Sequence, residues 1–293
     1  GNPRFDAPAD LEWSTLYNKV DTTIHLSYSY NETSAESDYH IAQSHYLETW
    51  SDGRTPEGHL VPVQPLIEPL FETFDELSLL SNLVYDVSKE NYAIVKDTFG
   101  TLGGTDFNQF LKEGIIESIS FPRSSKTVNV SALAKLLKRA STKKVQLGLN
   151  NLELRFIPSF HAHDGRLANN GWMMECPDPI TKLTWDNALL ISPRLAKELE
   201  SEYGVSIFAS STAMNEGSDF FKSVKGELQK NSSVFKRGKE SAIIAQIQVG
   251  GKNLDIPIHV LPGLANYTVV LPYGMGRKQV GRVGENVGIN TFG

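Results

Sequence analysis

The spacing of hydrophobic positions along the chain changes near residue 145. Upstream, leucines recur every three residues from Leu77 to Leu83, which is typical of one face of a helix. Downstream, apolar residues alternate with polar ones over Leu152–Phe156, as in a strand with one buried face. A length of 293 residues suits about two domains. We therefore predict an α/β domain over residues 1–145 and an all-β domain over residues 146–293.

The first sixty residues predict a mixed α/β arrangement. Asp10–Val20 has a helical pattern, and Thr22–Tyr28 is rich in the β-branched and aromatic residues that favour strands. The polar segment Asn31–Asp38 then forms a crossover before Tyr39–Tyr46 returns to partly apolar sequence. Residues 61–72 contain three prolines, each of which removes a backbone donor, so this segment is expected to be extended connecting chain.

Three or four helices are expected to follow. Each candidate helix begins after a side chain that can accept a hydrogen bond from a free N–H of the first turn. Thr73 and Glu76 have the spacing of a reciprocal capping box. The predicted caps are Thr73, Ser88, Thr105 and Ser131, and Gly114 is expected to end the third helix.

The second half predicts strands separated by turns. Val145–Pro158 reads as a half-buried strand, and a polar loop follows from His161 to Asn170. Ser192 and Pro193 then start a helix that Gly204 ends. Three further strands are expected at Ala242–Val249, Leu254–Leu261 and Tyr267–Pro272. Together these strands predict a compact β-barrel.

Charge and cysteine content exclude several classes of partner and site. A net charge of −6 gives no electrostatic reason to expect nucleic acid or an anionic membrane as a general partner. Basic residues cluster at Lys135–Lys144 and Lys230–Lys239, and we interpret both clusters as solvated faces or loops. The single cysteine excludes an internal disulfide framework, a four-cysteine zinc site and a self-contained iron–sulfur cluster. No apolar run reaches the roughly 18 residues of a membrane-spanning helix.

Motifs that carry chemistry are scarce. His161-Ala162-His163-Asp164 offers imidazole and carboxylate groups, and the two histidines would share one face of a strand. A metal site needs three or four ligands, and no partner set is evident, so no metal site is predicted. Gly274-Met275-Gly276 has the wrong spacing for a dinucleotide-binding loop and is interpreted as a turn. No catalytic residue is assigned.

Several longer strings are specific enough to indicate a family. They are Gly1–Pro3 with Ala7–Leu11; Asn31–Ala35, Asp38–Ala42 and His45–Trp50; Gln64–Leu70; Asn169–Trp172, Pro177–Lys182 and Trp185–Asn187; and Gly281–Gly284 with Gly288–Asn290. Together they resemble the molybdopterin-oxidoreductase-like subunit of alternative complex III, often described as Tat-variant-translocated or iron–sulfur-binding. The match is spread over nearly the whole chain.

The resemblance implies a fold, a location and partners. Residues 1–60 would be the end of a Rossmann-like layer, and residues 150–293 a double-psi β-barrel of the kind that holds the pterin dinucleotide in molybdenum enzymes. The chain would be a fragment of a subunit at the periplasmic side of the bacterial inner membrane, exported by Tat through a signal missing upstream. Its partners would be a multihaem cytochrome, an integral membrane quinol-binding subunit and a ferredoxin-like domain. Iron–sulfur clusters would lie in a missing C-terminal part.

The function that follows is a non-catalytic structural part of a quinol-oxidising electron-transfer complex. We expect no cofactor in this chain, molybdopterin included, because no redox-cofactor motif is evident. The alternative is the cofactor-binding end of an active molybdenum bis-pterin oxidoreductase. In that case the residues at the pterin would be His161, His163, Arg166, Asn169, Asn170, Trp172, Asn286 and Asn290.

One segment departs from the family pattern. Residues 205–240 form an extra, polar, lysine-rich insert. Within it, residues 217–240 bury little apolar surface to offset their ordering entropy, so we predict that residues 217–240 form an exposed excursion from the barrel.

Overall fold

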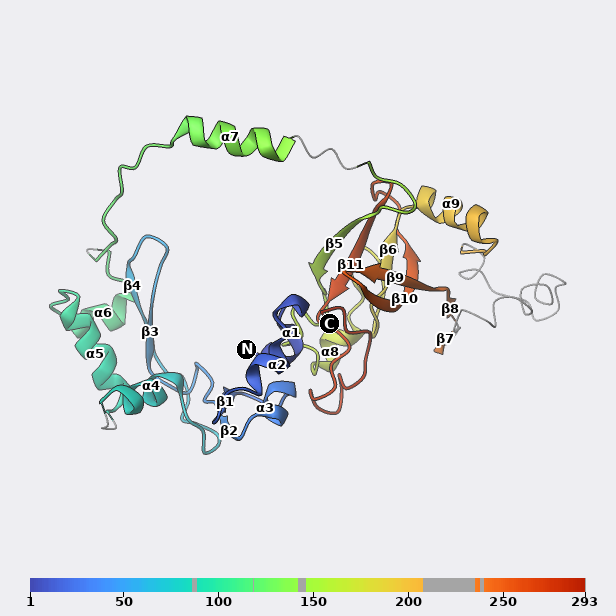
Figure 1. Cartoon of the computed structure of the whole chain (residues 1–293). Helices are drawn as coiled ribbons and strands as arrows, with labels where there is room; N and C mark the ends of the chain where they lie inside the picture. Colours follow the sequence, from blue (N-terminus) through green and yellow to red (C-terminus); the bar gives the residue numbers. More distant parts are fainter. Residues whose placement is uncertain (86–88, 118, 142–145, 208–234, 238–239, 293) are drawn as a thin grey trace. The chain divides into compact units, whose positions relative to one another are not determined.

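The chain divides into two compact units in a computed structural model, whose helices and strands are labelled in Figure 1. The model describes residues 1–85, 89–117, 119–141, 146–207, 235–237 and 240–292. The first unit contains Lys19–Thr142 with Gly1, and the second contains Asn2–Asn18 with Lys143–Gly293. This differs from the predicted division, which assigned the whole N-terminal segment to the first domain.

The N-terminal segment joins the second unit through an aromatic side chain. It forms α1 (Pro3–Asp6), a 3-10 turn (Ala9–Leu11) and α2 (Trp13–Tyr17). Phe5 of α1 is buried, with its ring centroid 5.2 Å from that of Phe292 and 5.5 Å from the guanidinium carbon of Arg277. Both partners lie near the C-terminal end of the sequence, where no local pattern could show the contact.

The first unit begins with a small parallel α/β motif. β1 (Ile24–Ser27) pairs in parallel with β2 (Tyr39–Ala42), and α3 (Glu32–Glu36) connects them. Asn31 and Ser34 form a reciprocal capping box at the start of α3. The segment expected to be a polar crossover therefore contains a short helix.

A phenylalanine-rich core organises the rest of the first unit. This part of the unit comprises the hairpin of β3 (Ser51–Arg54) and β4 (Leu60–Val63), the helices α4 (Glu76–Tyr85), α5 (Asn91–Thr101) and α6 (Phe107–Glu113), and α7 (Val130–Ser141), which contributes no described side chain to the core. Phe99 of α5 stacks on Phe110 of α6 at 4.9 Å between centroids. Phe107, Leu60 and Val95 complete this cluster, and the last two are at most 1% exposed. Burial on this scale stabilises by about 1.5–3 kcal/mol for each large side chain.

The helices begin close to the predicted positions but with different caps. The Asp75 carboxylate accepts from Ser78 N at 2.8 Å, whereas Thr73 bonds to Ser44. Asp106 caps α6 in place of Thr105, and the Asn129 side chain accepts from Ala132 N at the start of α7 in place of Ser131. Ser88 lies outside the described residues; α5 begins after Glu90, which makes no side-chain cap bond. Gly114 ends α6 in the left-handed conformation, as predicted.

The second unit is built on a five-stranded mixed sheet. Its strand order is β5-β11-β6-β10-β9. The strands are β5 (Glu153–Pro158), β6 (Leu189–Ile191), β9 (Ile244–Val249), β10 (Lys252–Val260) and β11 (Thr268–Tyr273). β11 runs parallel to β5, and β10 runs parallel to β6, whereas the β11–β6 and β10–β9 pairs are antiparallel. The three C-terminal strands lie where the sequence predicted them.

The expected closed, all-β domain is not what the described residues show. Their sheet is open, with β5 and β9 at its edges, and the unit also contains α8 (Gly171–Glu175) and α9 (Pro193–Tyr203). β5 is exposed at five of its six positions, as befits a strand with a neighbour on one side only. α9 is capped by Ser192 and ended by Gly204, as predicted, and it places Leu195 in the core formed with the sheet.

The structure describes only part of the predicted insert. Its described pieces are residues 205–207 and a short antiparallel pair, β7 (Phe235–Arg237) with β8 (Glu240–Ala242). Residues 208–234 and 238–239, which carry most of the predicted excursion, lie outside the described residues.

Candidate functional site

The candidate site is the loop between β5 and α8. Ser159, at the end of β5, accepts backbone N–H bonds on Oγ from His161 (3.2 Å) and Ala162 (3.3 Å). His163 N donates to Ser159 O at 2.9 Å, and Gly165 N donates to Ala162 O at 2.9 Å. The loop is therefore a series of tight turns, fixed by a serine that is only 5% exposed.

A separate small core lies under these turns. It consists of Ala162, Ala168 and Met174 from the loop and α8, packed with Met275 and Val280 from the C-terminal tail. These five residues are 6% exposed or less. The loop and the tail therefore form one structure, although about 110 residues separate them in sequence.

Glycines allow the tail to lie directly on the loop. A Cβ at Gly274 would lie 2.2 Å from His163 O, and one at Gly284 would lie 2.1 Å from Ala168 O. Gly274 also has a φ of +106°, which other residues rarely adopt. The chain bends at Gly274, and Gly274 and Gly276 permit close backbone contact with His163 and Asn290.

The two histidines of the loop do not lie on a strand. His161 is 3% exposed, and its Nε2 lies 2.7 Å from the carbonyl oxygen of Cys176. His163 has a φ of +55°, and its side chain is 56% exposed. The strand spacing assumed for this pair fails because the chain turns at His163. His161 is consequently a buried structural residue, whereas His163 faces solvent.

Asp164 and Arg166 form the strongest charge pair of the loop. Arg166 Nε lies 2.8 Å from Asp164 Oδ1, and Nη2 lies 2.5 Å from Oδ2. Arg166 N also donates to Asp164 Oδ1 at 3.2 Å. Hydrogen bonds from Arg166 hold the pKa of the Asp164 carboxyl well below its usual range, despite partial burial, and Asp164 raises the pKa of Arg166.

The ion pair predicts how the loop responds to acid. Because the folded pKa of Asp164 is depressed, its stabilisation is present above the unfolded pKa of about 3.9 and is lost only as the pH falls through the lower folded value. Arg166 is 69% exposed, so the pair should be worth at most about 1 kcal/mol. We expect amide hydrogen exchange at Gly165–Leu167 to stay slow down to about pH 3. In Asp164→Ala exchange should be faster at every pH at which Asp164 is ionised in the folded wild type, and the difference should vanish only at lower pH. Equal exchange in both proteins at neutral pH would contradict the role of the pair.

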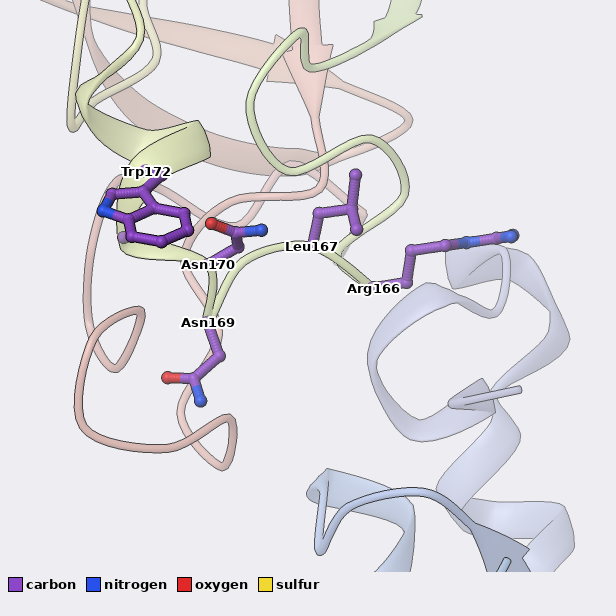
Figure 2. Close-up of a pocket in the computed structure, with 6 residues that line it drawn as sticks. Arg166, Leu167, Asn169, Asn170 and Trp172 are labelled. Atoms are coloured by element: carbon purple, nitrogen blue, oxygen red, sulfur yellow. The ribbon is translucent and has the colours of Figure 1, made fainter. Parts of the chain in front are cut away.

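A shallow cavity of about 560 Å³ opens beside the loop (Figure 2). Its lining residues are Arg166, Leu167, Asn169, Asn170, Gly171 and Trp172. Figure 2 shows the side chain of Arg166 pointing away from the two asparagines, with Trp172 at the other end of the row. Trp172 is 87% exposed. Four of the eight predicted site residues therefore meet at one cavity.

The two asparagines are partly committed to the fold. Asn169 Oδ1 accepts from Val283 N at 3.0 Å, and Asn170 Oδ1 caps α8 by accepting from Met173 N at 3.2 Å. Their Nδ2 groups make no hydrogen bond within the described residues. The cavity thus offers two amide donors and an exposed indole.

The remaining predicted residues lie elsewhere. His161 and His163 line a second cavity of about 370 Å³ with Asp178 and Asp186. Asn286 has a φ of +58°, and its N–H donates to Arg277 O at 2.7 Å. Asn290 Oδ1 accepts from Phe292 N at 2.9 Å. Neither tail asparagine lines the two cavities, so the predicted set is divided among three places.

Two buried polar residues that organise the site were missed in the sequence. Arg277 is 5% exposed and donates from Nη1 to Gly165 O at 3.0 Å, which ties the tail to the loop. Asn187 is 3% exposed and bonds to the backbone of Pro272 and Ile289. Asn187 belongs to one of the strings that carry the family resemblance, and this was the one sequence signal that could have indicated its role. Arg277 lies beside Gly274 and Gly276, and no sequence pattern indicated its role.

The residues present do not fit a phosphate-rich cofactor. A dinucleotide diphosphate is bound by converging N–H groups or by several basic side chains. Arg166 is the one charged residue among those lining the cavity, and Asp164 already occupies two of its nitrogens. Within the described residues there is no group of three His, Cys, Asp or Glu side chains placed to hold a metal ion. No described helix is long and apolar enough to cross a membrane.

Comparisons with known proteins give a fold. No family model matches the chain, and no curated protein matches it. The structure is similar to that of acetylene hydratase from Pelobacter acetylenicus, with a TM-score of 0.51 and 12% sequence identity. The similarity covers 93% of this chain and 36% of that one, so this chain spans little more than a third of its length. At this identity the likeness concerns the fold alone, and it supports the molybdopterin-oxidoreductase-like fold that the sequence resemblance implies.

Proposed function

We propose that the chain is a non-catalytic structural part of a periplasmic respiratory electron-transfer complex of the alternative complex III type. The family resemblance supports membership of this complex. The geometry of the loop supports a role without catalysis. The observation that carries the proposal is the Asp164–Arg166 ion pair, which compensates the one charged side chain of the 560 Å³ cavity. The second unit would then be the counterpart of a double-psi pterin-binding barrel that has lost its ligand.

Charge compensation matters because a pterin dinucleotide is anionic. A phosphate approaching Arg166 would meet the Asp164 carboxylate 2.5 Å from Nη2 and would have to displace it. Each tenfold in affinity corresponds to about 1.4 kcal/mol, so displacing a pair worth at most about 1 kcal/mol lowers the affinity for phosphate by up to about fivefold. In the proposed role the loop is kept because it packs on the tail.

The second candidate is the cofactor-binding end of an active molybdenum bis-pterin oxidoreductase. It is favoured by the likeness to acetylene hydratase and by the Nδ2 groups of Asn169 and Asn170, which make no hydrogen bond to the described part of the chain and lie beside exposed Trp172. An amide pair and an indole would suit the planar, hydrogen-bonding head of a pterin better than its phosphates. His161 would be unavailable, since it is buried against Cys176.

Purification of the tagged full-length protein from its own cells separates the two candidates. We expect it to bring down a multihaem cytochrome, seen as haem absorption in the solubilised complex, with molybdenum and tungsten far below one atom per chain. An unrelated periplasmic protein with the same tag is the control. Absence of haem would refute the respiratory complex. Stoichiometric molybdenum or tungsten, with a fluorescent pterin after oxidation, would establish the second candidate instead.

A further inference from the structure

The positive charge of the chain is concentrated in the segment that contains α7. Residues 122–144 contain seven basic residues and no acidic one, so the other residues together carry −13. The basic residues are Arg123, Lys126, Lys135, Lys138, Arg139, Lys143 and Lys144. A net charge of −6 for the whole chain therefore conceals one strongly cationic segment, and the exclusion of anionic partners does not apply to it.

α7 also separates its apolar and basic residues onto opposite sides. At 3.6 residues per turn, Val130, Leu133 and Leu137 fall on one side of the helix with Leu136 at its border. Lys135, Lys138 and Arg139 fall on the other side. Asn129 accepts from Ala132 N at 3.0 Å and so fixes where the helix starts. The segregation is thus a property of a defined helix, drawn as one continuous ribbon in Figure 1.

The apolar side of α7 is not used inside the first unit. All ten residues from Val130 to Arg139 are exposed. Val130 is 73% exposed, Leu136 and Leu137 are each 61% exposed, and Leu133 is 45% exposed. Contiguous exposed apolar side chains rimmed by charge mark an interaction surface rather than an ordinary solvated face.

We propose that α7 binds the surface of a bilayer that contains anionic lipids, lying in the plane of the interface. Its composition favours lipid over a protein partner. Protein interfaces are enriched in aromatic residues and depleted in lysine, but residues 122–144 contain no aromatic residue and five lysines. Leucine on one side and lysine on the other is the pattern of interfacial helices, whose long basic side chains reach the headgroups. Twelve residues with three charges lie on a membrane and do not cross it.

Co-sedimentation of the purified chain with lipid vesicles tests this surface. We expect binding to vesicles of phosphatidylcholine with phosphatidylglycerol at low salt, and no binding to phosphatidylcholine alone. Replacing Lys135, Lys138 and Arg139 with serine should lower the partition coefficient about a hundredfold. Leu133→Glu with Leu137→Glu should abolish binding to anionic vesicles.

A charge-matched variant controls for non-specific attraction. Lys96, Lys112 and Lys252 are exposed lysines outside the segment, and replacing these three with serine removes the same charge. That variant should bind as the wild type does, and all variants should keep the wild-type thermal unfolding curve because every replaced side chain is exposed. Equal loss in the control, or no vesicle binding by the wild type, would overturn the proposal. Slow hydrogen exchange of α7 only in the assembled respiratory complex would then identify a protein partner. The experiment is independent of the proposed function, since it needs neither haem nor metal.

Discussion

Replacing Asn187 with aspartate is expected to lower the free energy of unfolding of the second unit by about 3–5 kcal/mol. Asn187 Nδ2 donates to Pro272 O at 3.1 Å and to Ile289 O at 3.0 Å, while Oδ1 accepts from Ile289 N at 2.8 Å. Aspartate keeps the acceptor but loses both donors and places a carboxylate against two carbonyl oxygens. Each buried polar group left unsatisfied costs about 1–3 kcal/mol.

Urea unfolding followed by tryptophan fluorescence measures the loss. Trp13 and Trp185 belong to the same unit as Asn187 and are partly buried, so their fluorescence reports its unfolding. Asn253 on β10 is exposed, so Asn253→Asp is a matched control that should change stability by less than about 0.5 kcal/mol. Similar shifts of the unfolding midpoint in the two variants would show that Asn187 does not organise the tail.

Gly274→Ala should destabilise the second unit by about 3–5 kcal/mol, whereas Gly263→Ala should cost about 1 kcal/mol. Both glycines have positive φ, +106° and +97°, so the backbone strain is similar. The two positions differ in the room available for a side chain. A Cβ at Gly274 would lie 2.2 Å from His163 O, whereas nothing lies within 4 Å of a Cβ at Gly263. The difference between the two unfolding free energies therefore isolates the close contact of tail and loop.

Limited proteolysis of the Gly274→Ala and Gly263→Ala variants measures the stability of the loop itself. Gly274→Ala should also speed cleavage of the loop at Arg166, because the tail no longer holds it in place. Gly263→Ala should leave that cleavage rate unchanged. If the two variants are equally stable and equally resistant, the packing of tail on loop does not hold the site.

Helix positions followed from the sequence better than helix caps did. Hydrophobic spacing located α4 to α6, but Asp75 and Asp106 cap the first and third of these where Thr73 and Thr105 were predicted. Asp, Asn, Ser and Thr are nearly equivalent as caps, and neighbouring candidates compete. Ser192 was predicted correctly because Pro193 beside it fixes the first helical residue.

The sequence predicted that the candidate site is a loop, but not the conformation of that loop or the positions of its side chains. The polar run after β5 indicated the loop, and Arg166, Asn169, Asn170 and Trp172 do line one cavity. The roles of the two histidines depended on the left-handed conformation of His163, which only a few per cent of residues other than glycine adopt and which the sequence pattern did not indicate.

The pairing of distant strands was beyond any local pattern. Alternation indicated the strands, but a period of two is the same in parallel and antiparallel sheets. β5 pairs with β11, whose residues are 115 positions later, and Phe5 packs against Phe292. Contacts of this kind are set by the whole core, so the described strands form an open mixed sheet where a barrel was expected.

The β5–β11 pairing also determines the order of events during synthesis. Synthesis of β5 is complete once Pro158 has been added. Its one partner strand among the described residues, β11, begins only at Thr268. At about 5–20 residues per second, the strand waits roughly 6–20 s with its backbone N–H and C=O groups unpaired. Phe5 waits longer for Phe292. During translation the first unit can therefore fold while the second stays open, and the nascent chain presents an unpaired strand edge to which chaperones, or neighbouring chains on the same messenger, can bind.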